Sequence, residues 1–166
     1  MTRRVMVGAV PMGGGARVSV QSMTNTDTRD AQATLDQIKR LAEAGCDIVR
    51  VSVYDEACAE AVKRLVAESP VPLVADIHFD HRLAIRAIEN GIAKVRINPG
   101  NIGGEKNVRA LADCVKAHRV PVRVGVNGGS LEKELLQRHG GPTAGALAES
   151  ALNQARMLEG MGVHDI

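Results

Sequence analysis

Two hydrophobic periods alternate along the chain, and this alternation constrains its fold more than any other feature. Short β-branched segments with period two are followed by segments rich in Ala, Leu, Glu and Lys with helical spacing. We predict strands at 17–23, 47–53, 71–78, 93–98 and 120–127, and helices at 31–44, 56–68, 81–90, 106–118 and 143–159. Successive βα units of this kind predict a parallel sheet with right-handed crossovers and with helices outside it.

The residues between these segments support the same interpretation. Gly45 and Gly91 stand where two helices are expected to end, just before strands. The segment from Val5 to Ser19 predicts a small hairpin that leads into the first strand. Its Gly13–Gly15 run is followed by a strand and not by Gly-Lys-Ser/Thr, which favours a turn over a phosphate loop. Ser130 is expected to cap a short amphipathic helix at 131–138.

Four consecutive predicted strands carry polar side chains on one face and aliphatic side chains on the other. Because side chains alternate along a strand, the polar faces hold Arg50 and Ser52, Asp76 and His78, Arg96 and Asn98, and Arg123, Gly125 and Asn127. In an open doubly wound sheet helices would bury both faces, at a high cost for each unpaired charge. In a (β/α)8 barrel one face lines the interior, and its C-terminal rim forms the active site.

The pattern therefore predicts an α/β fold, a partial (β/α)8 TIM barrel of about five βα units preceded by a hairpin. The chain has 166 residues, whereas such barrels typically have about 250. Its last residues end a helix with glycine and then repeat the Asp-Ile pair that opens the second strand. We expect the chain to be truncated before a sixth strand.

Three arginines on this polar face, Arg50, Arg96 and Arg123, indicate the ligand class. Arginine binds phosphate oxygens through two parallel hydrogen bonds and stays charged at any working pH. Three converging guanidinium groups exceed what one carboxylate needs and suit a diphosphate. The alternative is internal pairing, in which Asp76 binds one arginine and backbone carbonyls bind the others. The loop at 98–104 is equally compatible with anion binding through backbone N–H groups and with a simple turn.

Composition excludes several other classes of protein. The two aromatic residues, Tyr54 and Phe79, offer no platform for stacking bases, so we expect no nucleic-acid partner. No apolar run approaches the length of a membrane span, and the start lacks a signal peptide's apolar region; we expect a cytoplasmic protein. Cys46, Cys58 and Cys114 are widely spaced without a CxxC pair, and we expect no metal site in this chain.

Five motifs, taken in chain order, resemble one known family. They are VQSMTNT at 20–26, IVRVS at 48–52, LVADIHFD at 73–80, VRINPGNIG at 95–103 and VRVGVNGGSL at 122–131. Together they resemble the 4-hydroxy-3-methylbut-2-enyl diphosphate synthases of the methylerythritol phosphate pathway of isoprenoid biosynthesis. The resemblance covers essentially the whole chain. One departure is Gly128, where the family more often has alanine.

The resemblance implies an oxidoreductase that reductively opens and dehydrates 2-C-methyl-D-erythritol 2,4-cyclodiphosphate. It also implies a [4Fe-4S] cluster held by three cysteines and a glutamate in a C-terminal domain, fed by ferredoxin or flavodoxin, in a homodimer. By motif match, the substrate-binding residues would be Arg50, Asp76, His78, Arg96, Asn98, Arg123 and Asn127. No catalytic residue is assigned. The family's cluster cysteines are not in this chain, so residues 1–166 would form the N-terminal part of the substrate-binding barrel and be inactive alone.

Two other functions remain open from the residues themselves. A pterin-binding barrel of the dihydropteroate synthase type has a similar architecture and an anion-binding rim, although no residue set for holding a flat bicyclic ring is evident. A catalytically silent, anion-binding half-barrel is also compatible with the missing cluster cysteines.

Overall fold

A computed structural model of the chain describes residues 2–98 and 102–166. The strands are β1 (Val5–Val7), β2 (Val10–Met12), β3 (Gln21–Met23), β4 (Ile48–Val53), β5 (Leu73–Ile77), β6 (Lys94–Ile97) and β7 (Val122–Val124). The helices are α1 (Ala31–Glu43), α2 (Glu56–Glu68), α3 (His81–Glu89), α4 (Glu105–His118), α5 (Lys133–His139) and α6 (Ala144–Gly160), with a 3-10 turn η1 at Gly128–Ser130.

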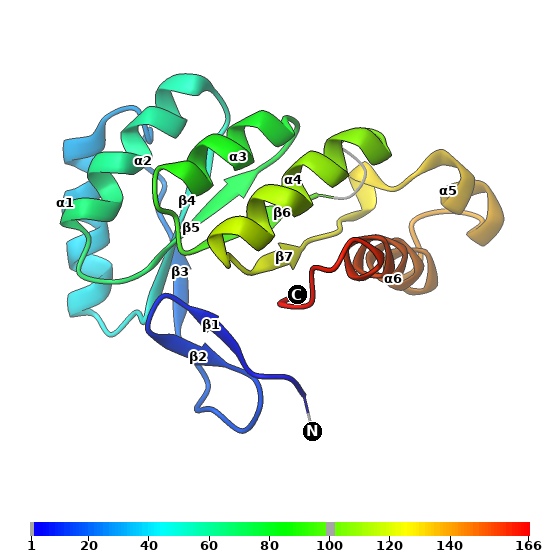
Figure 1. Ribbon diagram of the computed structural model, residues 1–166, viewed down its shortest axis with the longest axis horizontal. Helices are drawn as coiled ribbons and strands as arrows, with labels where there is room; N and C mark the ends of the chain where they lie inside the picture. The colour runs from blue at the N-terminus through cyan, green and yellow to red at the C-terminus, as the bar shows by residue number, and fades with distance from the viewer. Residues whose placement is uncertain (1, 99–101) are drawn as a thin grey trace.

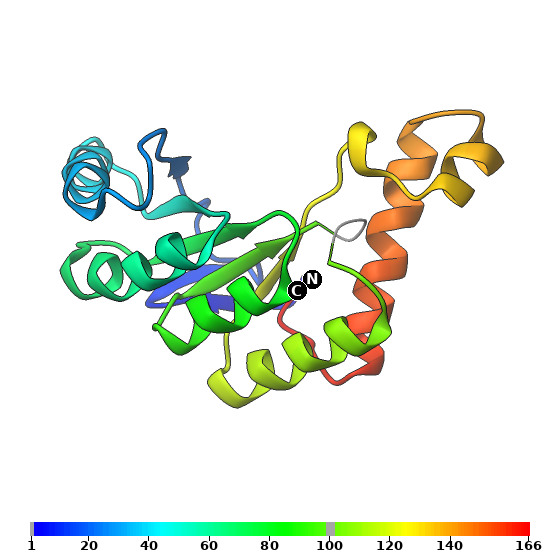
Figure 2. The same ribbon diagram turned by 90° about the horizontal axis from the view of Figure 1, so that it is seen from above.

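Strands β3 to β7 form one parallel sheet in chain order, and β1 pairs with β2 in an antiparallel hairpin. Helices α1 to α4 follow one another across the outer face of the sheet (Figure 1). Seen from above, these helices form a curved layer around the sheet, and α6 stands at the end opposite α1 (Figure 2). The predicted α/β fold with βα units of a TIM barrel is confirmed.

Short polar side chains start four of the helices. Asp30, Asp55, Asp80 and Thr143 each accept a hydrogen bond from a backbone N–H of the following first turn. Such caps satisfy N–H groups that have no partner within the helix. At the other ends, Gly45 and Gly91 follow the last residues of α1 and α3 with φ of +97° and +92°, a conformation that favours glycine. The helix boundaries therefore follow local chemistry that the sequence displays.

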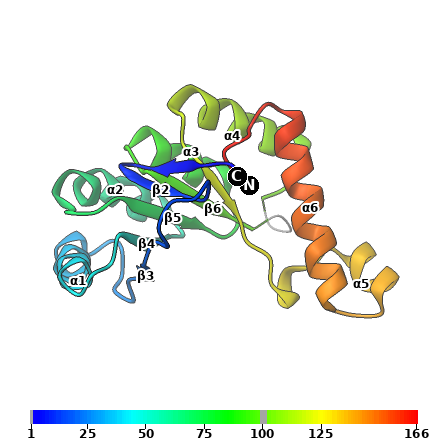
Figure 3. The same cartoon turned by 90° about the horizontal axis from the view of Figure 1, so that it is seen from below.

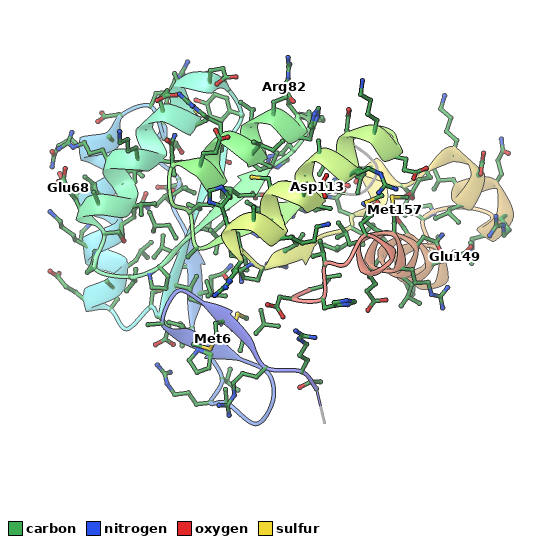
Figure 4. The ribbon with its side chains drawn as sticks, viewed as in Figure 1. Met6, Glu68, Arg82, Asp113, Glu149 and Met157 are labelled. Carbon is green, nitrogen blue, oxygen red and sulfur yellow. The ribbon has the colours of Figure 1, made fainter. Side chains whose placement is uncertain are left out.

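The outer face of the sheet carries the main hydrophobic core. Val49, Val51 and Val53 of β4 pack with the corresponding aliphatic residues of the neighbouring strands against the apolar sides of the helices. Charged side chains cover the opposite sides of those helices, as Glu68 of α2 and Arg82 of α3 show (Figure 4). Since one face of each strand is committed to this core, the polar residues of β4 to β7 must face the inside of the curve.

The hairpin covers the amino-terminal end of the inner face. Val7 of β1 packs against Ile48 and Val74, which are inward-facing residues of β4 and β5. Viewed from below, β1 and β2 lie across the end of the sheet (Figure 3). The expected hairpin is confirmed, with its turn at Gly8–Ala9. The Gly13–Gly15 run forms a separate turn closed by a hydrogen bond from Ala16 N–H to the Gly13 carbonyl.

Two local predictions are wrong. The first strand of the parallel sheet begins at Gln21 rather than at Arg17, because residues before Val20 have no neighbouring strand to pair with. Arg17 instead donates a hydrogen bond to the Asp47 side chain, and Val18 is 90% exposed. Ser130 does not cap α5. The cap of that helix is Glu132, which makes no side-chain capping bond, and Ser130 belongs to η1.

The residues after α6 return to the sheet beside β7. The Asp165 carbonyl accepts a hydrogen bond from Val122 N–H, and the Asp165 carboxylate pairs with Arg3 Nε at 2.9 Å. The two ends of the chain therefore meet near the amino-terminal end of β7.

Candidate functional site

Strand register determines which polar residues lie level with one another on the inner face. Ser52, Asp76, Arg96 and Arg123 are direct neighbours across β4 to β7 and form one row. Arg50 is level with Met23, Val74 and Lys94, one row closer to the amino-terminal ends of the strands. The three arginines share one face, as predicted, but Arg50 is not level with Arg96 and Arg123; this offset depends on register, which cannot be read from each strand separately.

The Asp76 carboxylate nevertheless joins the two rows. Its Oδ1 accepts a hydrogen bond from Arg96 Nη1 at 3.0 Å, and its Oδ2 lies 3.5 Å from Arg50 Nε. Asp76 is 4% exposed and Arg96 is 9% exposed. Internal pairing thus occurs, but one carboxylate serves two arginines and leaves one net positive charge.

Arg123 adds a second net charge to the row. It is exposed, and within residues 2–98 and 102–166 it has no ion-pair or hydrogen-bond partner. A cation on the same face as two paired arginines, with its own guanidinium open to solvent, is suited to an incoming anion.

Lys94 is a fourth inner-face cation that the sequence analysis missed. It is two residues before Arg96, so the alternation of β6 already placed both on one face. The side chain is 5% exposed, and its ammonium lies 3.4 Å from Gln21 Oε1 and 3.6 Å from Met12 Sδ. Burial, together with the charges of Arg123 and Arg50, lowers the pKa of Lys94 to about 8.

A neutral cluster lies beyond the arginine row, towards the carboxyl ends of the strands. Asn98 Nδ2 donates to Ser130 Oγ at 2.8 Å, and Ser130 Oγ donates to Asn127 Oδ1 at 2.8 Å. Ser130 therefore connects the ends of β6 and β7, a role that its position in the sequence did not reveal. Asn98 is buried, whereas Asn127 is exposed.

His78 directly follows the last residue of β5, at the same rim. It is half-buried, and its ring centroid lies 6.0 Å from that of the exposed Phe79. The predicted residues thus form two groups, Arg50–Asp76–Arg96 and Asn98–Asn127, with Arg123 and His78 beside them. Ser130, which was not predicted for the site, joins Asn98 to Asn127. Part of the candidate anion loop at 98–104, residues 99–101, lies outside the described residues.

A cavity of about 550 Å³ lies beside the amino-terminal half of this face. Lys94 and Arg123 contribute its cationic wall, and Val7, Met12 and Leu152 contribute apolar surface from the hairpin and α6. This partly open space beyond β7 therefore lies between the hairpin and α6, and its lining includes the cations Arg3, Lys94 and Arg123.

The cysteines do not form a site with one another. Cys58 is buried in α2, while Cys46 and Cys114 are partly buried against the main core. Burial raises the pKa of Cys58 and of Cys114, which favours the neutral thiol over the metal-binding thiolate. Among the described residues, no group of three His, Cys, Asp or Glu side chains is arranged to hold a metal ion. Residues 2–98 and 102–166 therefore do not fit an iron–sulfur cluster.

No helix within the described ranges is both long enough and apolar enough to span a membrane.

Comparison with known proteins gives a consistent family match. A family model described as the GcpE TIM-barrel domain matches residues 2–166. The 4-hydroxy-3-methylbut-2-en-1-yl diphosphate synthase (flavodoxin) of Clostridium perfringens is 56% identical over 165 residues, which cover 99% of this chain and 47% of that protein. The protein of the same name from Geobacter sulfurreducens shows the same identity and coverage. The chain thus spans about half the length of the curated relatives it matches.

Among solved structures, a dihydropteroate synthase from Xanthomonas albilineans in complex with 7,8-dihydropteroate aligns with a TM-score of 0.66. The alignment covers 99% of this chain and 62% of the dihydropteroate synthase chain, at 18% sequence identity. At that identity the likeness shows a shared fold and does not favour a pterin ligand.

Proposed function

This chain belongs to the GcpE TIM-barrel domain family, and we propose that it supplies the diphosphate-binding part of a 4-hydroxy-3-methylbut-2-en-1-yl diphosphate synthase. Under this proposal, residues 1–166 are the N-terminal part of the substrate-binding barrel, and a C-terminal iron–sulfur domain of the complete protein lies outside them. The names of the relatives and the cationic inner face support this proposal.

The charge of the inner face is the observation that carries the proposal. The described strands β4 to β7 place Arg50, Lys94, Arg96 and Arg123 on that face against the single carboxylate of Asp76. Uncompensated cations on a partly buried surface are costly unless an anion binds there. A diphosphate supplies several negatively charged oxygens to such a set.

Each predicted site residue receives a binding role. Arg123 and the outward N–H groups of Arg96 and Arg50 bind phosphoryl oxygens. Asp76 holds Arg50 and Arg96 in place through its two oxygens. His78 and the neutral cluster of Asn98, Ser130 and Asn127 offer hydrogen bonds to the remaining substrate oxygens at the rim.

The reaction of the complete protein is a two-electron reduction. 2-C-methyl-D-erythritol 2,4-cyclodiphosphate takes up two electrons and two protons, its ring opens, and water leaves to give 4-hydroxy-3-methylbut-2-enyl diphosphate. Flavodoxin, which the relatives' names contain, or ferredoxin would deliver the electrons through a [4Fe-4S] cluster held outside this chain. The roles of residues 1–166 are therefore confined to binding. A homodimer and a cytoplasmic location remain predictions.

The test uses the complete protein that contains this chain, purified without oxygen. We expect it to form 4-hydroxy-3-methylbut-2-enyl diphosphate from the cyclic diphosphate when reduced flavodoxin is supplied, with detection by mass spectrometry. Formation of dihydropteroate from a pterin diphosphate instead would contradict the proposal. Binding of the cyclic diphosphate without turnover would indicate a catalytically silent anion-binding barrel.

A further inference from the structure

Gly125 lies on the inner face directly after β7, between Arg123 and Asn127. Its N–H donates to the Ile97 carbonyl at 2.9 Å, so its backbone continues the pairing of β7 with β6. Gly125 is not among the residues with positive φ. Its backbone conformation is therefore open to other residues, and conformational freedom does not explain glycine here.

Space does explain it. A Cβ atom at position 125 would lie 2.4 Å from Nε, 2.9 Å from Cζ and 2.8 Å from Nη2 of Arg96. These are three atoms of one guanidinium group, and contacts this short are not sustained by real side chains. Arg96 Nε is buried and has no hydrogen-bond partner among the described residues. The Nε edge of the guanidinium thus rests against the bare backbone of Gly125.

The opposite constraint on the same guanidinium comes from Asp76. Arg96 Nη1 donates to Asp76 Oδ1 at 3.0 Å, and Asp76 also holds Arg50. The Arg96 fork is therefore fixed between a carboxylate and a glycine backbone. Moving the fork away from position 125 would also disturb the carboxylate that orients the second arginine.

We propose that Gly125 is a positioning residue for the diphosphate site: its lack of a side chain admits the Arg96 guanidinium to the place from which it binds phosphate. This inference rests on the proposed function and adds a determinant to it. Gly125 acts through Arg96. Because the crowded atoms belong to the end of a flexible side chain, an added methyl group shifts Arg96 and leaves the strand in place.

The test compares Gly125→Ala with Gly160→Ala in the complete protein. Gly160 also lacks a positive φ, and a Cβ there meets nothing within 4 Å. We expect Gly125→Ala to raise the dissociation constant of the cyclic diphosphate by about tenfold or more, the effect of losing one charged hydrogen bond, in calorimetric titration. We expect Gly160→Ala to bind as the unmodified protein does and to keep its midpoint of thermal unfolding. Gly125→Ala should stay folded, with a midpoint lowered only by the loss of the Arg96–Asp76 hydrogen bond.

Repeating the Gly125→Ala substitution in an Arg96→Lys variant distinguishes positioning of Arg96 from a merely structural role of Gly125. In Arg96→Lys the narrower side chain leaves room at position 125, so adding Gly125→Ala should change the dissociation constant by less than about twofold. An equal loss in both backgrounds would overturn the inference.

A crystal structure of Gly125→Ala decides the matter without any ligand. We expect the Arg96–Asp76 hydrogen bond to be lost; if Arg96 keeps its present position, the inference is wrong. If the unmodified protein binds no diphosphate, the proposed function fails, and the crystal structure still tests whether Gly125 positions Arg96.

Discussion

Replacing Lys94 by methionine tests the electrostatics of the inner face. Lys94 is a buried cation with no carboxylate partner in the described part of the chain, and its nearest polar atoms belong to Gln21 and Met12. Its pKa falls from 10.5 to about 8, first because of burial and then because of Arg123 and Arg50. Each tenfold change in a protonation equilibrium is worth about 1.4 kcal/mol, so the buried charge costs about 3 kcal/mol of folding free energy.

The sign of the pH dependence follows from proton linkage. Between pH 8 and pH 10.5 the folded chain has released the Lys94 proton while the unfolded chain still holds it. The stability of the unmodified chain therefore rises with pH across this window. Lys94→Met removes the titrating group, so near neutral pH the variant should be the more stable by about 3 kcal/mol, and the difference should shrink as the pH rises through the window.

Urea-induced unfolding of the 166-residue chain, followed by circular dichroism at several pH values, measures this difference. Lys39→Met, which removes an exposed lysine from α1, is the matched control and should show no such convergence. The reasoning is refuted if Lys94→Met is no more stable than the unmodified chain near neutral pH, or if their difference does not change with pH.

Two further predictions concern carboxylates. Asp76→Asn leaves two arginines without their shared partner and should lower the free energy of unfolding by about 3 kcal/mol, measured by the same urea titration. Asp113→Asn on the exposed side of α4 is the control and should have little effect. Equal stability of the two variants would contradict the pairing of Asp76 with the arginines. Asp27→Asn removes the acceptor that, with burial, raises the pKa of Tyr54 to about 12. The pKa should then fall towards 10, measured by ultraviolet absorbance of the single tyrosine; an unchanged titration would argue against that hydrogen bond.

The fold was predictable because it depends on local periodicity. The period-two alternation of β4 to β7 separates core valines from Arg50, Asp76, Arg96 and Arg123, and the caps at Asp55 and Asp80 mark where helices start. These signals need only the residues within one element. The exposed segment before Gln21 shows the limit, since an apolar alternating segment forms a strand only where a neighbour pairs with it.

The arrangement of the site was less predictable because it depends on register and on residues distant in sequence. Alternation assigns Arg50 and Arg96 to one face but does not say that Arg50 lies one row lower, or that Asp76 binds both. Ser130 joins Asn98 across 32 residues of sequence. Of the two site residues that the sequence analysis missed, Lys94 and Ser130, Lys94 could have been predicted, because it is two residues before Arg96 and so lies on the same face of β6.

The most direct test of the diphosphate-binding site is the affinity of the complete protein for 2-C-methyl-D-erythritol 2,4-cyclodiphosphate after Arg123→Gln. Arg123 is exposed and has no ion-pair partner among the described residues, and its charge opposes that of the buried Lys94, so its replacement should not lower the free energy of unfolding. Calorimetric titration should show binding weakened by about 1.5–3 kcal/mol, the value of a hydrogen bond to a charged group. Arg109→Gln on the exposed side of α4 should bind as the unmodified protein does. Equal affinity of the two variants would contradict the diphosphate site.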